Sequence, residues 1–339
     1  MLMETNWQLR TTSMEDPALT VVIPTRGRPV LLARCLDALC RQTLALHAYE
    51  IIVVDDGPDD DTRTVVERFA AGAARQGLLI QYVPSPGPHS PAAARNRGWR
   101  RARGGIVAFT DDDTQPDANW LKAGIAAFVP ETHAATGRVM MPLPASPTDY
   151  ELDASCLTHG EFVTANCFCR RATLERLNGF DERFPMAWRE DSDLQFRMLR
   201  AGARIAHASD AVVVHPIRPA AWGVSLKQQR KIMFDALLYR KHPALYRTRI
   251  RRTSRWDYYA AVGSALAAIL ALAHGAPRLA LGATAAWCAI TGWLCIRRLH
   301  RTSRALDHIA EMVVTSALIP PLAIFWRIVG AIRFRVWVA

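Results

Sequence analysis

The sequence predicts an α/β protein with a mostly parallel, doubly wound sheet, followed by a C-terminal α-helical membrane region. In the first part of the chain, short apolar segments rich in β-branched residues alternate with polar helical segments. Strands and helices that alternate in this way indicate right-handed βαβ units and therefore a parallel sheet. The last part of the chain holds long apolar segments flanked by arginines, which is typical of helices inserted in a membrane.

Four segments in the first part of the chain have the composition of buried strands. They are apolar, and turn residues or prolines bound them. We expect these strands at 18–25, 49–54, 78–83 and 104–110. Helices are expected between them, starting at Pro29, at about Asp61 and at Ala92. A proline suits the first turn of a helix, and the leucines that follow Pro29 recur on one face.

Net charge and cysteine usage narrow the class of protein. The 339 residues are enough for a large core, and the net charge is +11. Arginines gather on both sides of the first two apolar C-terminal segments, at Arg247, Arg249, Arg251, Arg252, Arg255, Arg297, Arg298, Arg301 and Arg304. Anionic lipid and the positive-inside rule explain this clustering better than nucleic acid does. Seven cysteines without C-x-x-C spacing favour a reduced, cytoplasm-facing protein over a zinc site or a disulfide framework.

Acidic side chains follow two of the expected strands. Asp55 and Asp56 end the second, and Asp111, Asp112 and Asp113 end the fourth. The carboxyl ends of parallel strands meet at one edge of a sheet, where open α/β sheets bind their ligands. Three carboxylates at a strand end favour a hard divalent cation that carries phosphate oxygens, because burying them unpaired costs much desolvation energy. A solvated acidic turn is the alternative interpretation.

Glycine-rich phosphate loops are missing from the sequence. Neither G-x-x-x-x-G-K-[ST] nor G-x-G-x-x-G occurs, which argues against P-loop NTPases and dinucleotide-binding Rossmann enzymes. Thr25, Arg26 and Arg28, at the end of the first strand, offer backbone donors and two guanidinium groups. We therefore expect a metal ion and arginine to hold the phosphates.

Several motifs follow one another in a fixed order. They are Val-Val-Ile-Pro24-Thr25, Ile-Val-Val-Asp55-Asp56-Gly57, Ala-Arg95-Asn96-x-Gly98, Phe-Thr-Asp111-Asp112-Asp113, Asn178-Gly-Phe-Asp-Glu-x-Phe184 and Trp188-Arg-Glu190-Asp191-x-Asp193-Leu. Over residues 18 to 220 this set resembles family-2 glycosyltransferases of the GT-A fold, the first four as donor-site motifs and the others as the acceptor-side signature. A set of motifs in order is far more specific than any one of them.

The resemblance implies a role for each matched donor residue. Asp56, with Asp55, would hydrogen-bond the nucleotide base, close to Pro24, Thr25 and Arg26. Arg95 would approach the base or the diphosphate, and Asp111 or Asp112 would face the ribose. Asp113, with Asp111, would ligate Mg²⁺ or Mn²⁺. Such an ion stabilises the negative charge that grows on a departing nucleoside diphosphate.

His215 ends a further strand and matches a histidine that is a metal ligand or a diphosphate contact in some GT-A enzymes. A structural histidine at the end of a strand is the alternative. On the acceptor side, the resemblance implies that Asp191, beside Glu190, is the catalytic base, which deprotonates an acceptor hydroxyl. Acidic residues also favour the first turn of a helix, and a helix is expected from Glu190 to about Arg200. Trp188 suits an acceptor sugar ring or, equally, a core position.

The same observations predict the domain organisation. We expect an N-terminal extension at 1–17, without the apolar region of a secretory signal, and a GT-A glycosyltransferase domain at 18–220. Basic amphipathic helices at 221–255 would link it to the membrane region at 256–339, lying either on the membrane surface or as ordinary surface helices.

The membrane region itself contains three apolar segments. The first two, at about 256–273 and 277–296, are expected to form a membrane hairpin with both ends in the cytoplasm. A buried helical hairpin in a soluble domain is the alternative. The third, at about 308–330, contains Pro320-Pro321 and Arg327 and is followed by more arginines. We expect a re-entrant or interfacial helix pair there, because a single crossing would place the last arginines on the other side.

These expectations combine into a metal-dependent glycosyltransferase on the cytoplasmic face of the inner cell membrane. The resemblance suggests a UDP-sugar donor with inversion, and the membrane region suggests a lipid-linked saccharide or similar acceptor. One alternative is a polyprenyl-phosphate sugar synthase, whose ionised acceptor needs no general base; the Glu190-Asp191 pair argues against it. Another is a catalytically silent, membrane-bound nucleotide-binding subunit. A processive synthase is disfavoured because no Gln-x-x-Arg-Trp follows Asp191.

Overall fold

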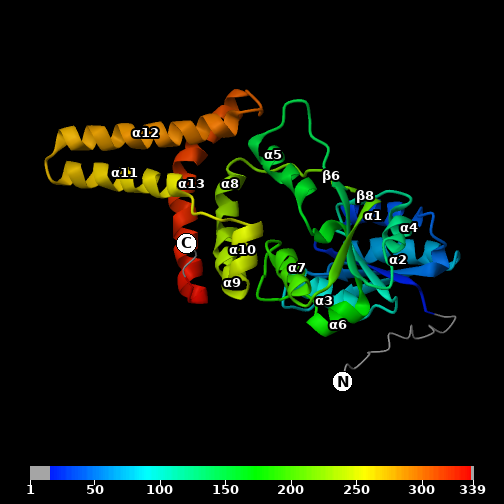
Figure 1. Ribbon diagram of the computed structural model, residues 1–339. Coiled ribbons are helices and arrows are strands. Elements are labelled where there is room, and N and C mark those ends of the chain that lie inside the picture. The colour runs from blue at the N-terminus through cyan, green and yellow to red at the C-terminus, as the bar shows by residue number, and fades with distance from the viewer. Residues whose placement is uncertain (1–15, 337–339) are drawn as a thin grey trace, which may run out of the picture. The chain divides into compact units, whose positions relative to one another are not determined.

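The structure is a computed structural model that describes residues 16–336 (Figure 1). Most of the expected N-terminal extension therefore lies outside the described residues. The chain divides into two compact units, each described separately below. Unit 1 comprises the chain up to Met140 together with Glu161–Pro185 and Met198–His215. Unit 2 comprises Met141–Gly160, Met186–Arg197 and the chain from Pro216 onward.

Unit 1 is built on one eight-stranded sheet in the order β3-β2-β1-β4-β7-β6-β8-β5. The strands are β1 Leu19–Thr25, β2 Tyr49–Asp55, β3 Leu79–Pro84, β4 Ile106–Phe109, β5 Gln115–Pro116, β6 Thr132–Met140, β7 Cys167–Arg170 and β8 Arg204–Val214. The first four lie where the apolar segments predict them. The helices of this unit are α1 Pro29–Cys40, α2 Asp60–Ala74, α3 Pro91–Trp99, α4 Trp120–Ala126 and α6 Arg171–Leu177, with the 3₁₀ turns η1 Leu46–Ala48 and η3 Thr164–Asn166.

The sheet is mixed, and four of its seven strand pairs are parallel, in agreement with the mostly parallel sheet that the sequence predicts. Strands β1 to β4 are parallel to one another, and β6 is parallel to β8. Strand β7 is antiparallel to both β4 and β6, and β5 is antiparallel to β8. An antiparallel pair needs no crossover helix on the sheet. The segment between β6 and β7 accordingly leaves unit 1 and contributes to unit 2.

The centre of the sheet is buried on both faces, which explains the continuous apolar character of β1 and β2. Leucines of α1 and the apolar side of α2 cover one face together with Trp120. On the other face, Ala94 of α3 packs against Ile52 and Val54. A Cβ atom on Gly98 would lie 2.3 Å from a methyl carbon of Val22. This glycine therefore allows α3 to lie directly on the strands.

Register aligns the strand ends that carry the predicted site. Thr25 is paired with Asp55 at the ends of β1 and β2, and Val22 is paired with Phe109 at the end of β4. The acidic triplet follows Phe109 directly. At the far side of the sheet, the His215 N–H donates to the Met140 carbonyl at 2.8 Å, which continues the β6–β8 pairing by one residue. The carboxyl ends of β1, β2, β4 and β8 thus lie at one edge.

Unit 2 is helical. It contains α5 Asp149–Ser155, the 3₁₀ turn η2 Cys156–His159, α8 Val224–Gln228, η4 Gln229–Ile232, α9 Met233–Lys241, α10 Pro243–Arg249, α11 Trp256–Ala273, α12 Pro277–Leu299 and α13 Leu306–Phe334. Helix α7, Glu190–Arg200, begins in this unit. In α9 every residue from Met233 to Tyr239 is buried, and the helix packs on α13. It is a core helix of the unit, not the surface or membrane-surface helix that the basic amphipathic pattern of 221–255 indicates.

Three helices of unit 2 are long and apolar enough to cross a membrane: α11, α12 and α13. The first two form an antiparallel hairpin, and α13 runs across this hairpin instead of alongside it (Figure 1). Residues 306–334 form one continuous helix that includes Pro320 and Pro321, so the expected helix pair is wrong. Two adjacent prolines remove only two backbone donors, and the packing of Pro320 in the buried face supports the helix there.

Candidate donor and metal site

Asp112 is the most deeply buried of the acidic triplet. Its side chain is 0% exposed and forms an ion pair with Arg28 at 2.8 Å. The Thr25 hydroxyl, at the end of β1, donates to its other oxygen at 2.6 Å. Burial raises the pKa of Asp112 to about 6, although Arg28 and Thr25 act in the opposite direction. Asp112 therefore connects the ends of β1 and β4, and its two oxygens are already engaged by the protein.

Asp111 pairs with Arg95 of α3, with the guanidinium nitrogen 2.8 Å from the carboxylate. Arg95 is 3% exposed and its guanidinium lies 5.8 Å from the centre of the Phe180 ring. Burial opposes the ionisation of Asp111, but the charges of Arg95, His215 and Arg28 outweigh it and hold the pKa of Asp111 below its usual range. Asp111 is thus a stable anion at neutral pH.

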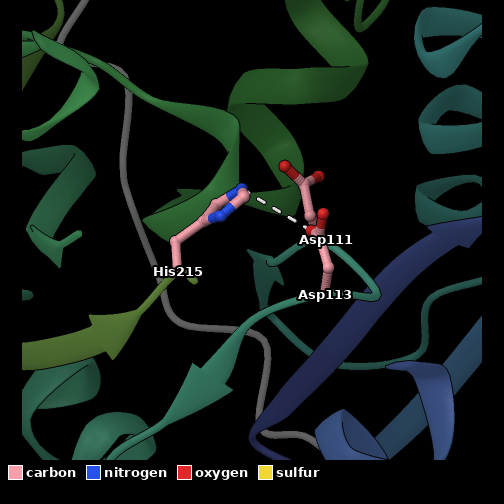
Figure 2. A group of neighbouring side chains, drawn as sticks. All are labelled: Asp111, Asp113 and His215. Carbon is pink, nitrogen blue, oxygen red and sulfur yellow. Dashed lines mark ion pairs between the residues drawn. The ribbon is translucent and has the colours of Figure 1, made fainter. Parts of the chain in front are cut away.

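Asp111, Asp113 and His215 form the only cluster among the described residues with the geometry of a metal site. One ligand atom of each lies within 4.8 Å of those of the other two. Figure 2 shows His215, from the end of β8, pointing at the turn after β4, with its Nε2 atom 3.5 Å from Asp113. Two carboxylates and one imidazole suit Mg²⁺ or Mn²⁺, with the nitrogen favouring Mn²⁺. The donor set present therefore fits the cation that the sequence predicts.

Arg28 is near this cluster as well as near Asp112. A second nitrogen of its guanidinium lies 3.6 Å from Asp113. Arg28 and Arg95 therefore compensate the three carboxylates from two sides, so the triplet is not the solvated acidic turn that was the alternative interpretation. Arg28 was noted in the sequence as a guanidinium at the strand end but was not singled out as a site residue, because nothing in its own motif distinguishes it.

Asp55 and Asp56 lie at the end of β2, where the resemblance places the nucleotide base. Asp55 is buried, accepts from the Tyr82 hydroxyl at 2.9 Å, and has one oxygen without a hydrogen-bond partner among the described residues. Burial raises the pKa of both carboxyls. Asp56 lies 3.3 Å from Nδ1 of His89. Tyr82 and His89 have no signature in the sequence that would identify them as parts of this site.

Pro24 and Arg26 flank the same edge. Pro24 is half-buried in β1 and is paired with Val54 of β2. Arg26 is exposed, and a Cβ atom on Gly57 would lie 3.1 Å from its Nε atom. The absence of a side chain at Gly57 therefore leaves room for Arg26 beside Asp56.

Asn96 of α3 is a buried residue that supports this site. In the sequence it stood out only as part of a motif. Its carbonyl oxygen accepts from the Trp99 indole and the Phe180 N–H, each at 2.8 Å. Its amide nitrogen donates to the Phe180 carbonyl and to Glu182, again at 2.8 Å each. Asn96 thus fixes the turn that carries Phe180, whose ring contacts Arg95.

The residues predicted for acceptor chemistry belong to unit 2. Asp191 lies in the first turn of α7 and accepts from the N–H and hydroxyl of Ser192 at 2.6 and 3.2 Å. Glu190 is buried, with 3% of its surface exposed. The Trp188 indole N–H donates to Asp235 of α9 at 3.1 Å. In α7, Asp193 forms an ion pair with Arg197 at 2.8 Å and lies 3.0 Å from Nε2 of His242.

Family comparisons identify the chain. The family model described as Glycosyl transferase family group 2 matches residues 106–329, which is more than half of the chain, and the model Glycosyl transferase family 2 matches residues 20–160. The chain belongs to glycosyltransferase family 2. It is therefore an enzyme, and the family predicted from the motifs is confirmed.

Curated relatives of this family-2 enzyme are moderately similar. Glycosyltransferase AglE from Haloferax volcanii is 27% identical over 226 residues, covering 64% of this chain and 72% of AglE. Validoxylamine A glucosyltransferase from Streptomyces hygroscopicus is 29% identical over 68% of this chain and 62% of its own length. Pre-mycofactocin glycosyltransferase from Mycobacterium tuberculosis is 30% identical over 59% of this chain and 43% of its length. The chain thus spans less than two thirds of the last two relatives.

Solved structures of similar shape agree with the GT-A fold. Mannosyltransferase PcManGT from Pyrobaculum calidifontis, in complex with GDP-Man and Mn²⁺, has a TM-score of 0.60 at 19% identity, covering 93% of this chain and 88% of that one. S. aureus TarS 1–349, in complex with UDP-GlcNAc, has a TM-score of 0.50 at 16% identity. The predicted fold class, a GT-A α/β domain followed by apolar helices, is confirmed.

Proposed function

We propose that this family-2 glycosyltransferase moves a sugar from a UDP-sugar, with inversion, to a hydroxyl of a membrane-associated acceptor such as a lipid-linked saccharide. The cluster of Asp111, Asp113 and His215 at the carboxyl edge of the sheet is the observation that carries this proposal. It lies beside Arg28 and Arg95, so that cationic groups and a metal-binding set occur together where a diphosphate would bind.

The proposed metal ligands are Asp111, Asp113 and His215, and the metal is Mg²⁺ or Mn²⁺. Bound there, the ion would stabilise the charge of the departing nucleoside diphosphate. Asp112 is held by Arg28 and Thr25, so we assign it the ribose side together with Asp111. The free oxygen of Asp55 and the carboxylate of Asp56 are acceptors for N–H groups of the base, with Pro24, Thr25 and Arg26 along the same edge.

The acceptor half of the proposal concerns residues of unit 2. Asp191 would take the proton of the attacking hydroxyl, Glu190 would support it, and Trp188 would offer its ring to an acceptor sugar. Relatives named for glucosyl transfer include the validoxylamine A enzyme and a Campylobacter jejuni β-1,3-glucosyltransferase named for a GalNAc(5)-diNAcBac-PP-undecaprenol substrate, the latter 33% identical over 29% of this chain. They support a saccharide hydroxyl, free or lipid-linked, as the acceptor.

Donor binding and turnover test the two halves separately. A thermal-shift screen of nucleoside diphosphates with and without Mn²⁺ should single out UDP, which stabilises the folded protein by about 2.7 kcal/mol at roughly 100-fold above Kd. Asp113→Ala should abolish the Mn²⁺-dependent part of this shift. Asp191→Ala should keep the shift but stop release of UDP from UDP-glucose with decyl β-glucoside as a probe acceptor. Equal loss of donor binding in both variants would contradict this division.

Two further results would favour the alternatives. Near-normal turnover of Asp191→Asn on a polyprenyl phosphate would indicate a polyprenyl-phosphate sugar synthase, because an ionised acceptor needs no base. Nucleotide binding without turnover on any sugar donor would indicate a silent subunit.

For the membrane region, we propose that α11 and α12 span the inner membrane and that α13 lies in its cytoplasmic interface. One side of α13 is protein-facing and partly polar: Thr315 and Ser316 accept from Arg298, which also pairs with Asp149 at 2.7 Å. The other side is apolar and exposed, at Val313, Val314, Leu318, Phe325, Ile328 and Ile332. A helix with one apolar face and arginines at both ends suits the plane of the interface.

Cysteine labelling tests this arrangement. Arg304→Cys and Arg335→Cys, before and after α13, should both react with a membrane-impermeant maleimide in inside-out vesicles, in a background whose native cysteines are replaced by serine. Labelling of the two positions from opposite sides would mean that α13 crosses the membrane.

A further inference from the structure

Arg189 has an unusual backbone conformation immediately before helix α7. Its φ angle is 74°, in the left-handed region that residues other than glycine rarely adopt. A conformation of this kind costs about 1–3 kcal/mol and persists only where surrounding contacts enforce it. The Arg189 carbonyl accepts from the Asp193 N–H at 2.9 Å, which is the first turn of the helix that carries Asp191. The backbone conformation of Arg189 therefore sets the direction in which helix α7, with Asp191 in its first turn, begins.

Asp235 of α9 supplies the contacts that hold this loop. One carboxylate oxygen accepts from Arg189 Nε at 2.7 Å and from the Trp188 indole at 3.1 Å. The other accepts from the Tyr246 hydroxyl of α10 at 3.3 Å. The Arg189 guanidinium also lies 4.4 Å from the centre of the Trp188 ring. Two consecutive loop side chains thus depend on one carboxylate that is 7% exposed.

Asp235 is itself held in place by the packing of α9 on α13. A Cβ atom on Gly330 of α13 would lie 2.4 Å from the Met233 carbonyl, so the two helices are in backbone contact. The Phe234 and Phe334 rings lie 6.0 Å apart on the same helix pair. The two residues immediately before Asp235 in α9 are therefore fixed against α13.

We infer that Asp235 is a positioning residue, which holds Trp188 and Asp191 in the arrangement needed for acceptor activation. The inference rests on the proposed function for the role of Asp191. It adds that a buried carboxylate of α9, far along the chain from Asp191, sets the geometry of the acceptor half. Asp235 has no direct role in the reaction and acts through Arg189 and Trp188.

The first test is Asp235→Ala in the full chain. Without its acceptor, the left-handed turn loses its support, so amide hydrogen exchange at residues 189–193 should become about tenfold faster or more. Exchange at residues 111–113 and the thermal shift with UDP and Mn²⁺ should stay at the wild-type level. Release of UDP from UDP-glucose with decyl β-glucoside should fall about 100-fold, which is the effect of a misplacement of about 1 Å. Asp235→Asn, which keeps the shape and one oxygen, should be intermediate.

A rescue variant separates positioning from general stability. Glycine accepts a positive φ without cost, so Arg189→Gly removes both the strain and the guanidinium that would be left without its carboxylate. The double variant Arg189→Gly with Asp235→Ala should therefore exchange more slowly at 190–193, and turn over at least about tenfold faster, than Asp235→Ala alone. If the double variant were no better than the single one, the positioning role would be wrong.

Glu50→Gln is a matched control in unit 1. Glu50 is a buried carboxylate paired with Arg103 at 2.9 Å, remote in the fold from the acidic triplet because it lies at the amino end of β2. Its loss should lower the thermal midpoint without changing exchange at 189–193 or turnover. Asp191→Asn separates the proposed base from the positioning role of Asp235. Full turnover of Asp191→Asn would overturn the proposed base, whereas normal exchange and turnover of Asp235→Ala beside an inactive Asp191→Asn would overturn the positioning role alone.

Discussion

Replacement of Asn96 by alanine offers a direct measure of how the donor half is supported. Asn96 is 1% exposed, and its side chain makes four hydrogen bonds of 2.8 Å. In Asn96→Ala the partly exposed Glu182 can turn to water, but the Trp99 indole and the Phe180 N–H and carbonyl remain buried without partners. Each such group costs about 1–3 kcal/mol, so the free energy of unfolding should fall by about 3 kcal/mol or more.

Urea unfolding, followed through the intrinsic fluorescence of the tryptophans in detergent micelles, gives this loss as a change of midpoint at constant slope. Asn119→Ala is the matched control. Asn119 accepts a single exposed hydrogen bond, from Thr43 at 2.8 Å, so its loss should stay within about 0.5 kcal/mol. Because the Phe180 ring contacts the Arg95 guanidinium, the variant should also weaken the UDP-dependent thermal shift. A loss below about 1 kcal/mol for Asn96→Ala would refute the idea that this side chain fixes the Phe180 turn.

Two other positions have expected effects that can be measured in the same way. Burial raises the pKa of Asp112 from 3.8 to about 6, so the folded state binds its proton more tightly than the unfolded chain. The protonated Asp112 therefore contributes its full stabilisation below the pKa that this carboxyl has in the unfolded chain. This contribution is lost as the pH rises to about 6. Without added metal, the free energy of unfolding of the wild type should fall by up to about 3 kcal/mol relative to that of Asp112→Asn between about pH 4 and about pH 7. Parallel plots of this free energy against pH for the two proteins would contradict the prediction. Gly330→Ala should push α13 away from the Met233 carbonyl and cost about 1–3 kcal/mol, whereas Gly292→Ala, with open space around it, should cost nothing.

The parts of the fold that the sequence predicts correctly depend on local patterns. Continuous apolar segments that end in acids mark β2 and β4, because a buried parallel strand has no polar face and its carboxyl end meets the ligand. His215 was suggested by the resemblance to some GT-A enzymes, and the structure brings it within 4.8 Å of Asp111 and Asp113. Each of these features can be predicted from one short segment of the sequence.

The features that the sequence does not predict depend on contacts between distant segments. The apolar composition of Cys167–Arg170 predicts a buried strand but does not show whether that strand runs parallel or antiparallel to its neighbours. The direction of β7 depends on the strands with which it pairs. The burial of α9 was missed because basic residues at its C-terminal end, Arg240 and Lys241, give it the appearance of a surface helix. Asp235 is separated from Trp188 by several elements, and no periodicity in a single sequence connects them.

The place of β8 in the sheet has a consequence for the order of folding. His215 joins Asp111 and Asp113 only when β8 has paired with β6, β6 with β7 and β7 with β4. These are long-range pairings, which form late because the entropy of closing large loops must be overcome first. A nascent chain that has folded β1 to β4 would therefore present the two carboxylates without the imidazole. Tight metal binding by all three ligands would then report that the whole sheet has formed, and the ion would stabilise the finished domain instead of guiding its early assembly.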